Sequence, residues 1–187
     1  MSDKNFVKAY LEDFATLIKP DNQIVDKIIN VKNILVQAKK DNAKIMIFGN
    51  GGSAAIASHV SVDLTKNANI KAVNFNEADL ITCFANDYGY ENWVSNALNF
   101  YADSNDVVIL ISSSGQSKNI INAAEKAKKI GLSVITLSGF LESNPLREMG
   151  DINLWVNSSE YNIVESVHQV WLLSIVEYLI SNKKTEI

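Results

Sequence analysis

The stretch Asp106-Val107-Val108-Ile109-Leu110-Ile111, followed directly by Ser112-Ser113-Ser114-Gly115-Gln116-Ser117, decides the fold of this chain. Its first half is β-branched and apolar on both faces, which is typical of a parallel strand covered by helices on both sides. Its second half is small and polar, and a helical pattern follows over residues 116–129. The stretch therefore predicts a strand, a loop and a helix of an open α/β sheet.

The same pattern of strand, loop and helix occurs earlier in the chain. Lys44-Ile45-Met46-Ile47-Phe48 is a short apolar run closed by glycines, and a helical pattern follows over residues 53–66. Further strands are predicted at 70–75, 133–137 and 152–156, and further helices at 76–86 and 162–180. Strands that alternate with helices in this way indicate a parallel sheet with helices on both faces.

We therefore expect one domain over residues 1–187, an α/β three-layer αβα sandwich with a five-stranded parallel sheet. Residues 1–40 are expected to form an N-terminal helical extension and residues 41–187 the αβα core. Within the extension, Ile24, Ile28, Val31 and Leu35 recur at helical spacing and form one apolar stripe.

Composition excludes several classes of protein. The net charge of −4 and the lack of an extended basic block argue against direct binding of nucleic acid. The first residues are polar and charged, and no apolar run approaches the roughly 18 residues of a membrane span, so we expect a cytoplasmic protein. The single cysteine, Cys83, excludes an internal disulfide, and its apolar neighbours predict a buried, inert thiol.

Two small-residue loops, Gly49-Asn50-Gly51-Gly52-Ser53 and Ser112 to Ser117, follow predicted strands and lead into predicted helices. Ligands of open parallel sheets bind beyond the carboxyl ends of the strands, where free N–H groups and the positive helix terminus attract anions. Neither loop contains the dinucleotide spacing Gly-x-Gly-x-x-Gly or a Gly-Lys-Ser motif. Serine clusters alone are more often helix caps, with Ser114 or Ser117 as candidates, but the pair of loops predicts an anion site.

Three segments together resemble the sugar isomerase (SIS) domain family, and within it the phosphoheptose isomerases: Phe48 to Ala55, Ala85-Asn86-Asp87-Tyr88-Gly89-Tyr90, and Ile111 to Ser117. The resemblance implies that Asn50, Gly51, Gly52 and Ser53 contact the sugar. It implies that Ser112, Ser113, Ser114 and Ser117 hold the phosphate, and that Asn86 and Asp87 line the same pocket. A turn that ends a helix before Tyr88-Gly89 is the alternative for Asn86-Asp87. Such proteins are typically homotetramers with sites between subunits, in which the apolar stripe of residues 24–35 would be covered.

The resemblance also implies catalytic residues on two helices. His59 matches a family histidine, and Asp63 stands on the same helical face where the family has Glu, with a side chain about 1.5 Å shorter. In the last helix, His168 matches a second histidine and Glu165 takes the place of a substrate-binding Gln. The family's catalytic histidine falls on Leu173, or on Leu172 in the other alignment. The expected catalytic set is therefore Asp63, His59 and His168, although a packed or capped histidine is the alternative for His168.

The same side chains are candidates for a metal site. His59, Asp63, Glu165 and His168 offer two imidazoles and two carboxylates, which suit zinc or a similar divalent ion if they converge. Their spacings are also those of ordinary helix-surface pairs. No other cofactor is required by the sequence.

Three functions follow from this pattern. The first is a phosphosugar aldose–ketose isomerase that converts sedoheptulose 7-phosphate to D-glycero-D-manno-heptose 7-phosphate for surface polysaccharide. The second is a non-catalytic phosphosugar-binding or regulatory protein that acts through protein contacts, like the family member that associates with the bacterial replication initiator. The third is an isomerase of a different phosphosugar, because Asp63 and the altered last helix change the reacting end of the pocket.

Overall fold

A computed structural model describes residues 2–183, and a five-stranded parallel sheet lies at its centre. The strands are β1 (Ile45–Phe48), β2 (Ala72–Asn74), β3 (Val107–Ser112), β4 (Ser133–Ser138) and β5 (Ile152–Trp155). They lie in the order β2-β1-β3-β4-β5, and every neighbouring pair is parallel. The predicted fold class is confirmed.

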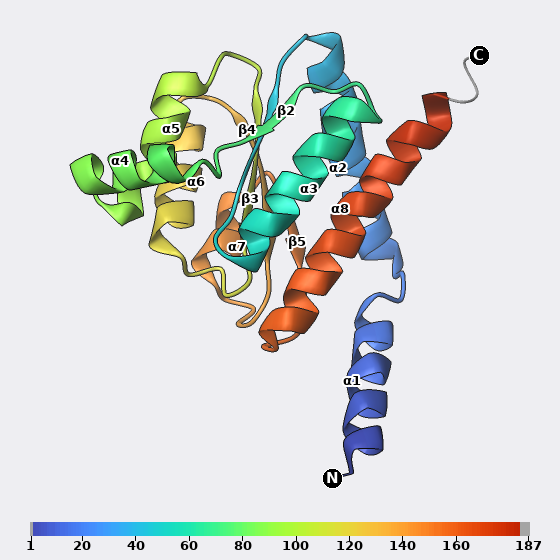
Figure 1. The fold of residues 1–187 in the computed structure, drawn as a ribbon. Coiled ribbons are helices and arrows are strands. Elements are labelled where there is room, and N and C mark those ends of the chain that lie inside the picture. Colours follow the sequence, from blue (N-terminus) through green and yellow to red (C-terminus); the bar gives the residue numbers. More distant parts are fainter. Residues whose placement is uncertain (1, 184–187) are drawn as a thin grey trace.

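Helices cover both faces of this sheet (Figure 1). Along the chain they are α1 (Asp3–Leu17), α2 (Asn22–Lys40), α3 (Gly52–Lys66), α4 (Ala78–Tyr88), α5 (Trp93–Tyr101), α6 (Lys118–Lys129), α7 (Pro145–Met149) and α8 (Tyr161–Lys183), with a 3-10 turn at Tyr90–Asn92. The sequence did not predict α5 or α7. α7 has only five residues, and α5 is short but buries Trp93, Val94, Ala97 and Leu98 at helical spacing.

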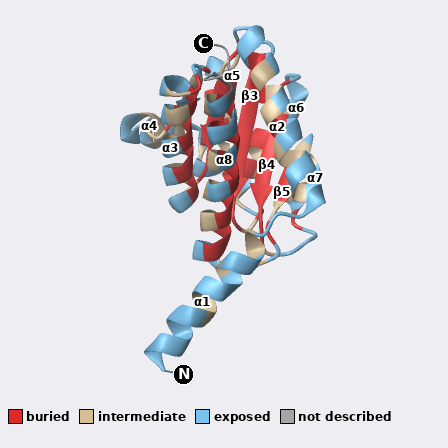
Figure 2. Cartoon of the chain, turned by 90° about the vertical axis from the view of Figure 1, so that its right-hand side faces the viewer, coloured by how far each residue is buried: buried red, intermediate tan, exposed pale blue. Residues whose placement is uncertain are grey.

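The central strands β1 and β3 contribute side chains to two hydrophobic cores, one on each face of the sheet. In β1 and β3 every residue is buried, as the red strands in Figure 2 show. Ile45 and Ile47 pack with α2, α3 and α8, whereas Met46 and Phe48 pack with α5 and α6 on the other face. This two-sided burial is the physical reason why the strands lack the alternation of apolar and polar residues seen in half-exposed sheets.

The N-terminal extension uses its helices differently. α2 packs on the sheet and buries Val31 and Leu35, whereas α1 projects from the body and has no buried residue (Figure 1). Two residues of the apolar stripe that was expected to be covered in an assembly, Val31 and Leu35, are thus already buried within the chain. Ile24 and Ile28 remain partly exposed.

α8 corrects one expectation about membranes. Residues 161–181 have a mean hydropathy of 1.3 and are long and apolar enough to cross a membrane by length and composition. The helix nevertheless contributes Val164, Val167 and Leu172 to the core beside the sheet. Its apolar character is that of a central packing helix, since Glu165 and His168 lie within the same run.

Cys83 is exposed, so the expectation of a buried thiol is wrong. It lies on α4, where Leu80, Ile81 and Phe84 take the inward positions and pack against the core. The Cys83 thiol is directed toward the Asp87 carboxylate, with 3.8 Å between Sγ and Oδ2. Cys83 is exposed because it lies on the face of α4 that points away from the core, although the segment as a whole is apolar.

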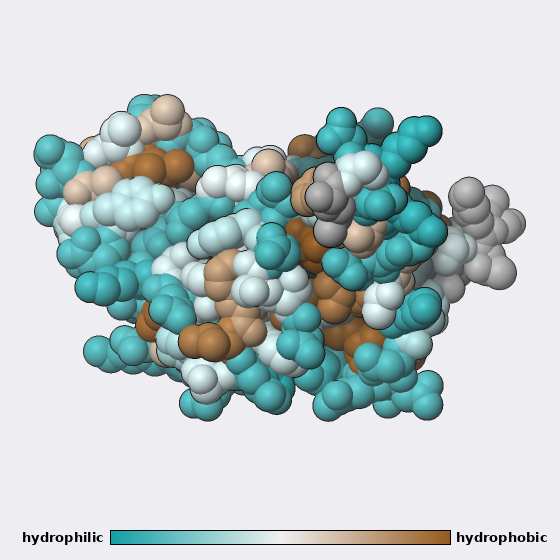
Figure 3. Space-filling model, turned by 90° about the horizontal axis from the view of Figure 1, so that it is seen from below, coloured by the Kyte–Doolittle hydropathy of each residue, from teal (hydrophilic) through white to brown (hydrophobic). Residues whose placement is uncertain are grey.

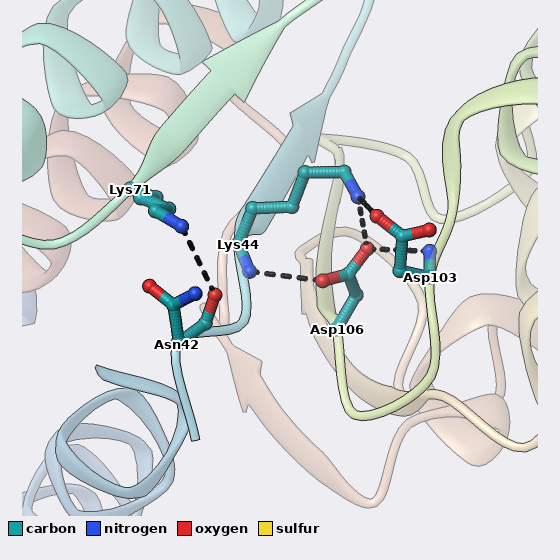
Figure 4. Close-up of polar contacts among 5 residues, drawn as sticks. All are labelled: Asn42, Lys44, Lys71, Asp103 and Asp106. Carbon is teal, nitrogen blue, oxygen red and sulfur yellow. Dashed lines mark hydrogen bonds and ion pairs between the residues drawn. The ribbon is translucent and has the colours of Figure 1, made fainter. Parts of the chain in front are cut away.

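A buried ion pair joins β1 to β3 at the amino ends of the strands (Figure 4). The Lys44 ammonium lies 2.6 Å from Asp106 and 2.7 Å from Asp103, and Asp106 also accepts hydrogen bonds from the backbone N–H groups of Lys44 and Asp103. Burial alone would lower the pKa of Lys44, but hydrogen bonds to the two carboxylates outweigh it and raise that pKa. Nearby, the Lys71 ammonium donates to the Asn42 carbonyl.

Replacement of Asp106 should destabilise the fold far more than replacement of Asp103. Asp106→Ala leaves two N–H donors and an ammonium without their buried acceptor, so the free energy of unfolding should fall by about 3 kcal/mol. Asp103 is exposed, so Asp103→Ala should cost much less than Asp106→Ala. Urea unfolding of both variants measures the difference, and equal losses would contradict it.

His168 is fully buried between α8 and the sheet, where its Nε2 donates to the Ser138 carbonyl at 3.0 Å. Its Nδ1 has no hydrogen-bond partner in the described part of the chain. Desolvation lowers the pKa of His168 to about 4, against the opposing effect of the bond to Ser138. The folded protein therefore holds this imidazole neutral.

Because the unfolded chain protonates this histidine near its ordinary pKa of about 6.5, stability should fall as the pH drops from 6.5 to 4. The contribution is fully present above pH 6.5, and the loss by pH 4 should reach about 3 kcal/mol. Urea unfolding at several pH values, in the wild type and in His168→Gln, isolates this term from the titration of the carboxylates. An unchanged difference between the two proteins across this range would contradict the prediction.

Candidate functional site

The two small-residue loops lie side by side because of the strand order. From β1 the chain proceeds to β2 on one side, whereas β3, β4 and β5 continue on the other side, so the direction reverses between β1 and β3. Both loops leave the carboxyl ends of these two neighbouring strands. Open α/β sheets bind ligands at such a switch point.

Both helices that follow the loops begin without a side-chain cap. α3 starts after Gly51 and α6 after Ser117, and within the described chain neither cap residue bonds an N–H group of its helix through a side chain. The first two N–H groups of each helix are therefore available to an anion, whereas those of Ala54 and Ile120 bond backbone carbonyls. The helix dipoles favour a negative charge there. Ser117 is the N-cap residue of α6, as its cap alternative expected, but its hydroxyl accepts from Ser112 at 3.0 Å and does not bond the helix. Ser114 accepts from the Gln116 N–H.

Two glycines of the first loop have distinct structural reasons. Gly51 has a φ of +54°, a left-handed conformation that side chains other than glycine's adopt at a cost. Gly52 leaves room for the carboxylate of Glu165, which would collide with a Cβ atom at that position. Ser53, which was expected to contact the sugar, is buried next to Gly49.

Two hydrogen bonds between side-chain amides join the first loop to α6, the helix that follows the second loop. Asn50 Nδ2 donates to Asn119 Oδ1 at 3.0 Å, and Asn119 Nδ2 donates back to Asn50 Oδ1 at 2.9 Å. The Tyr90 hydroxyl donates to the same oxygen of Asn50 at 2.9 Å. The sequence pattern did not identify Asn119 or Tyr90, because their roles depend on contacts 69 and 40 residues away.

Glu165 reaches the loops from α8. Its Oε1 accepts a hydrogen bond from the Ser113 hydroxyl at 3.4 Å, and its carboxylate lies against Gly52 at the start of α3. No cation lies within ion-pair distance of Glu165 in the part of the chain that the structure describes. A carboxylate thus stands between the two loops that the sequence assigned to an anion.

His59 lies farther along α3 and is held by partners on both ring nitrogens. Asp63 Oδ2 lies 3.3 Å from its Nε2, and the Gln169 side-chain nitrogen lies 3.1 Å from its Nδ1. If the amide of Gln169 donates to Nδ1, the neutral imidazole carries its proton on Nε2 and donates it to Asp63. The sequence analysis missed Gln169, although it follows His168 and lies one helical turn after Glu165.

A cavity of about 640 Å³ connects these side chains. It lies between α3 and α8, with one residue from α1, and is lined by Tyr10, Gly52, Ala55, Ile56, His59, Asn162, Glu165, Ser166 and Gln169. One end of the cavity is the first loop at Gly52, and His59 lies seven residues along α3, a rise of about 10 Å. The cavity can thus hold an elongated ligand whose anionic end lies at the loops.

Of the expected site residues, Gly52, His59 and Glu165 line this cavity, and three others lie away from both the cavity and the two loops. His168 faces the core and is hydrogen-bonded to β4, which corrects its expected role in catalysis and metal binding. Asn86 donates to Asp87 on the exposed end of α4, and no hydrogen bond joins either of them to the loops in the described residues. Gly89 ends that helix with a φ of +84°, which fits the alternative of a helix-ending turn.

The expected zinc set is not formed. With His168 in the core, His59, Asp63 and Glu165 remain, and the described residues contain no group of three His, Cys, Asp or Glu that could hold a metal ion. His59 and Asp63 instead pair with each other. We therefore assign no step to a metal.

The remaining assignments lie in two neighbouring loops, at the carboxyl ends of β1 and β3. Asn50, Gly51 and Gly52 lie in the first loop, and the serines 112, 113, 114 and 117 lie in the second loop beside it. Their contact with a sugar phosphate stays a prediction. Asp63 is one-quarter exposed and binds His59 and Asn67, and it lies eleven residues beyond Gly52, about 16 Å along the axis of α3.

Known proteins match the chain over most of its length. The SIS domain family matches residues 9–139. A phosphoheptose isomerase of Helicobacter pylori strain P12 is 30% identical over 174 residues, 90% of each chain. A probable phosphoheptose isomerase of Thermoplasma acidophilum is 35% identical over 168 residues, 86% of this chain and 90% of the relative.

A solved structure with the same fold is that of a phosphoheptose isomerase from Neisseria gonorrhoeae, with a TM-score of 0.88 and 24% identity. The match covers 95% of this chain and 99% of the other. The chain therefore belongs to the SIS domain family, and within that family it is similar to the phosphoheptose isomerases.

Proposed function

We propose that this chain is a phosphosugar aldose–ketose isomerase, which converts sedoheptulose 7-phosphate to D-glycero-D-manno-heptose 7-phosphate for surface polysaccharide. The observation that carries the proposal is the pair of uncapped helix starts at one crevice, beside a cavity that holds Glu165 and His59. The names of the relatives, at 30% identity or more over most of the chain, support the same activity.

The length of the cavity supports a long sugar. A fully extended seven-carbon chain spans roughly 10 Å from its phosphorus atom to C1, at about 1.5 Å per carbon–carbon bond. The rise of α3 from Gly52 to His59 is about the same. A phosphate held at the loops would therefore place C1 and C2 of a heptose beside His59 and Gln169.

In this arrangement the phosphate is bound without a cationic side chain. The hydroxyls of Ser114 and Ser117 and the N–H groups that begin α3 and α6 hold its oxygens. Asn50 is fixed by Asn119 and Tyr90, so its backbone approaches the sugar with little freedom to lose on binding. His59, held between Asp63 and Gln169, orients the oxygen end of the sugar.

One observation favours the non-catalytic alternative. The position at which the family resemblance implies a catalytic histidine is taken by Leu173, or by Leu172, which is buried in the core. A protein that binds phosphosugar and acts through protein contacts would need no such residue. Multiple turnovers distinguish the two functions.

We further propose a cytoplasmic homotetramer with its sites between subunits. α1 exposes Phe6, Val7 and Leu11 although it makes few contacts with its own chain. A cavity of about 460 Å³ between α2 and α8 is lined mostly by apolar residues, among them Val25, Ile29 and Val170. Figure 3, seen from the side toward which α1 projects, shows apolar side chains in patches among hydrophilic ones. Subunits that cover these surfaces would also enclose the cavity of about 640 Å³ between α3 and α8, since Tyr10 of α1 lines that cavity.

The purified protein should convert sedoheptulose 7-phosphate to the aldose through many turnovers, as followed by NMR. Ser117→Ala should raise KM about tenfold, because it removes a hydrogen bond to a charged phosphate. Ser104→Ala, in an exposed turn at the opposite edge of the sheet, should leave KM unchanged. If the wild type forms no aldose from this or any other phosphosugar, the isomerase function is wrong.

The assembly can be checked by sedimentation. The wild type should have four times the chain mass of 20.7 kDa, and Leu11→Asp should shift it to smaller species because a charge replaces an exposed apolar side chain of α1. Lys8→Gln, on the polar side of the same helix, is the control. A wild type that sediments as a monomer at micromolar concentration would contradict the proposed assembly.

A further inference from the structure

The carboxylate of Glu165 occupies the place of an anion. It lies against Gly52, at the uncapped start of α3, and it accepts a hydrogen bond from Ser113 of the second loop. The backbone at Gly52 can come this close only because the residue has no side chain. The same two features, a free helix start and a loop hydroxyl, are those that a phosphate would use.

A phosphate and this carboxylate cannot both bind at the start of α3, beside the second loop, without repelling each other. Two negative charges about 4 Å apart repel each other even in water, and more strongly where solvent is partly excluded. No cation neutralises Glu165 among the residues that the structure describes. A bound phosphate must therefore drive the carboxylate away from the start of α3.

The cavity determines where the displaced side chain goes. Glu165 lines it together with Gln169, which lies one turn later on α8 and contacts His59. Rotation of the glutamate side chain away from Gly52 moves its carboxylate along the cavity toward that turn, a distance of about 5 Å per helical turn. This is the end of the cavity where C1 and C2 of the sugar are expected.

We propose that Glu165 is both the internal anion of the empty site and the base of the isomerisation. Phosphate binding displaces its carboxylate from the start of α3 and thereby brings it beside the carbon atoms that exchange a proton. This inference rests on the proposed function and makes Glu165 the base in place of Asp63, the carboxylate of the expected catalytic set.

The other candidates are less well placed for that role. Both ring nitrogens of His59 already have partners, Asp63 at 3.3 Å and Gln169 at 3.1 Å, which hold the ring in place. Asp63 pairs with His59 and accepts a hydrogen bond from Asn67, and in the described part of the chain it does not line the cavity. His168 is enclosed in the core.

The chemical step involves no external oxidant or reductant. The Glu165 carboxylate takes the proton from C1 of the ketose, and the electron pair of that C–H bond forms the C1–C2 double bond of an enediol as the C2 carbonyl oxygen gains a proton from water. The carboxylic acid then returns its proton to C2, while the O1 hydroxyl gives its proton back to water and becomes the aldehyde oxygen. Glu165 ends as a carboxylate, and one carbon is oxidised as its neighbour is reduced.

The binding of inorganic phosphate tests the displacement. Titration calorimetry should show that Glu165→Gln and Glu165→Ala both bind phosphate about fivefold more tightly than the wild type, because they lack the competing charge. The alanine variant excludes an effect of a new amide donor. Glu177→Gln, on an exposed position of the same helix, should bind as the wild type does. Phosphate affinity that is unchanged or weakened in both Glu165 variants overturns the displacement.

Turnover and proton exchange test the base. Glu165→Gln should lower kcat by about 10² to 10⁴-fold and abolish the incorporation of deuterium from solvent at C1 and C2, although its phosphate affinity rises. Asp63→Asn should lower kcat less than tenfold. A Glu165→Gln variant within tenfold of the wild-type kcat, or an Asp63→Asn variant that loses as much as Glu165→Gln, overturns the assignment.

The activity and phosphate-binding measurements distinguish a failure of this inference from a failure of the proposed function. An active wild type with an active Glu165→Gln variant refutes only the role of Glu165. A wild type without turnover on any phosphosugar refutes the isomerase function and the base with it, whereas the phosphate titration still decides whether Glu165 competes for the cradle. Melting temperatures of the variants show whether a loss of activity reflects unfolding.

Discussion

The pairing of β1 with β3 is the interaction on which the rest of the site depends. At the amino ends of these strands, the backbone N–H of Lys44 and its ammonium both bind Asp106, one residue before β3 begins. This contact fixes the register of the two strands, so their carboxyl ends come level. The two small-residue loops are neighbours only because of that alignment, and no residue of either loop could create it.

The register also determines what α8 can reach. α3 begins directly at the carboxyl end of β1, and α8 packs along it on the same face of the sheet. Glu165 meets the start of α3, and Gln169 meets His59 farther along. Two side chains on one face of α8 are thus matched to two points on α3, and together they define the ends of the cavity.

Much of this arrangement could be predicted from the sequence, because it depends on local patterns. Apolar runs such as 106–111 predict buried parallel strands, and small residues after them predict loops with free N–H groups. The sequence also placed Asn50, Gly51 and Gly52 beside the serines, since carboxyl ends of parallel strands share one edge.

Contacts between distant helices could not be predicted in the same way. His168 and Glu165 are three residues apart on one helix, yet His168 is enclosed in the core and Glu165 faces the cavity. When a helix is apolar on most of its sides, the spacing of its apolar residues does not show which of its few polar residues faces the sheet. The exposure of Cys83 has the same cause, since the rotation of α4 about its axis depends on what Leu80 and Phe84 contact. Gln169 and Asn119 act only through partners far away in the sequence.

The absence of a lysine or arginine from the loops then acquires a physical meaning. A cation there would bind phosphate more strongly, but it would also hold Glu165 in an ion pair and keep the carboxylate at the start of α3. Hydroxyls and helix N–H groups attract a dianionic phosphate more strongly than a single carboxylate, so the phosphate can replace it. A cradle built from neutral groups is therefore compatible with a mobile carboxylate, and binding at one end of the cavity can prepare the chemistry at the other.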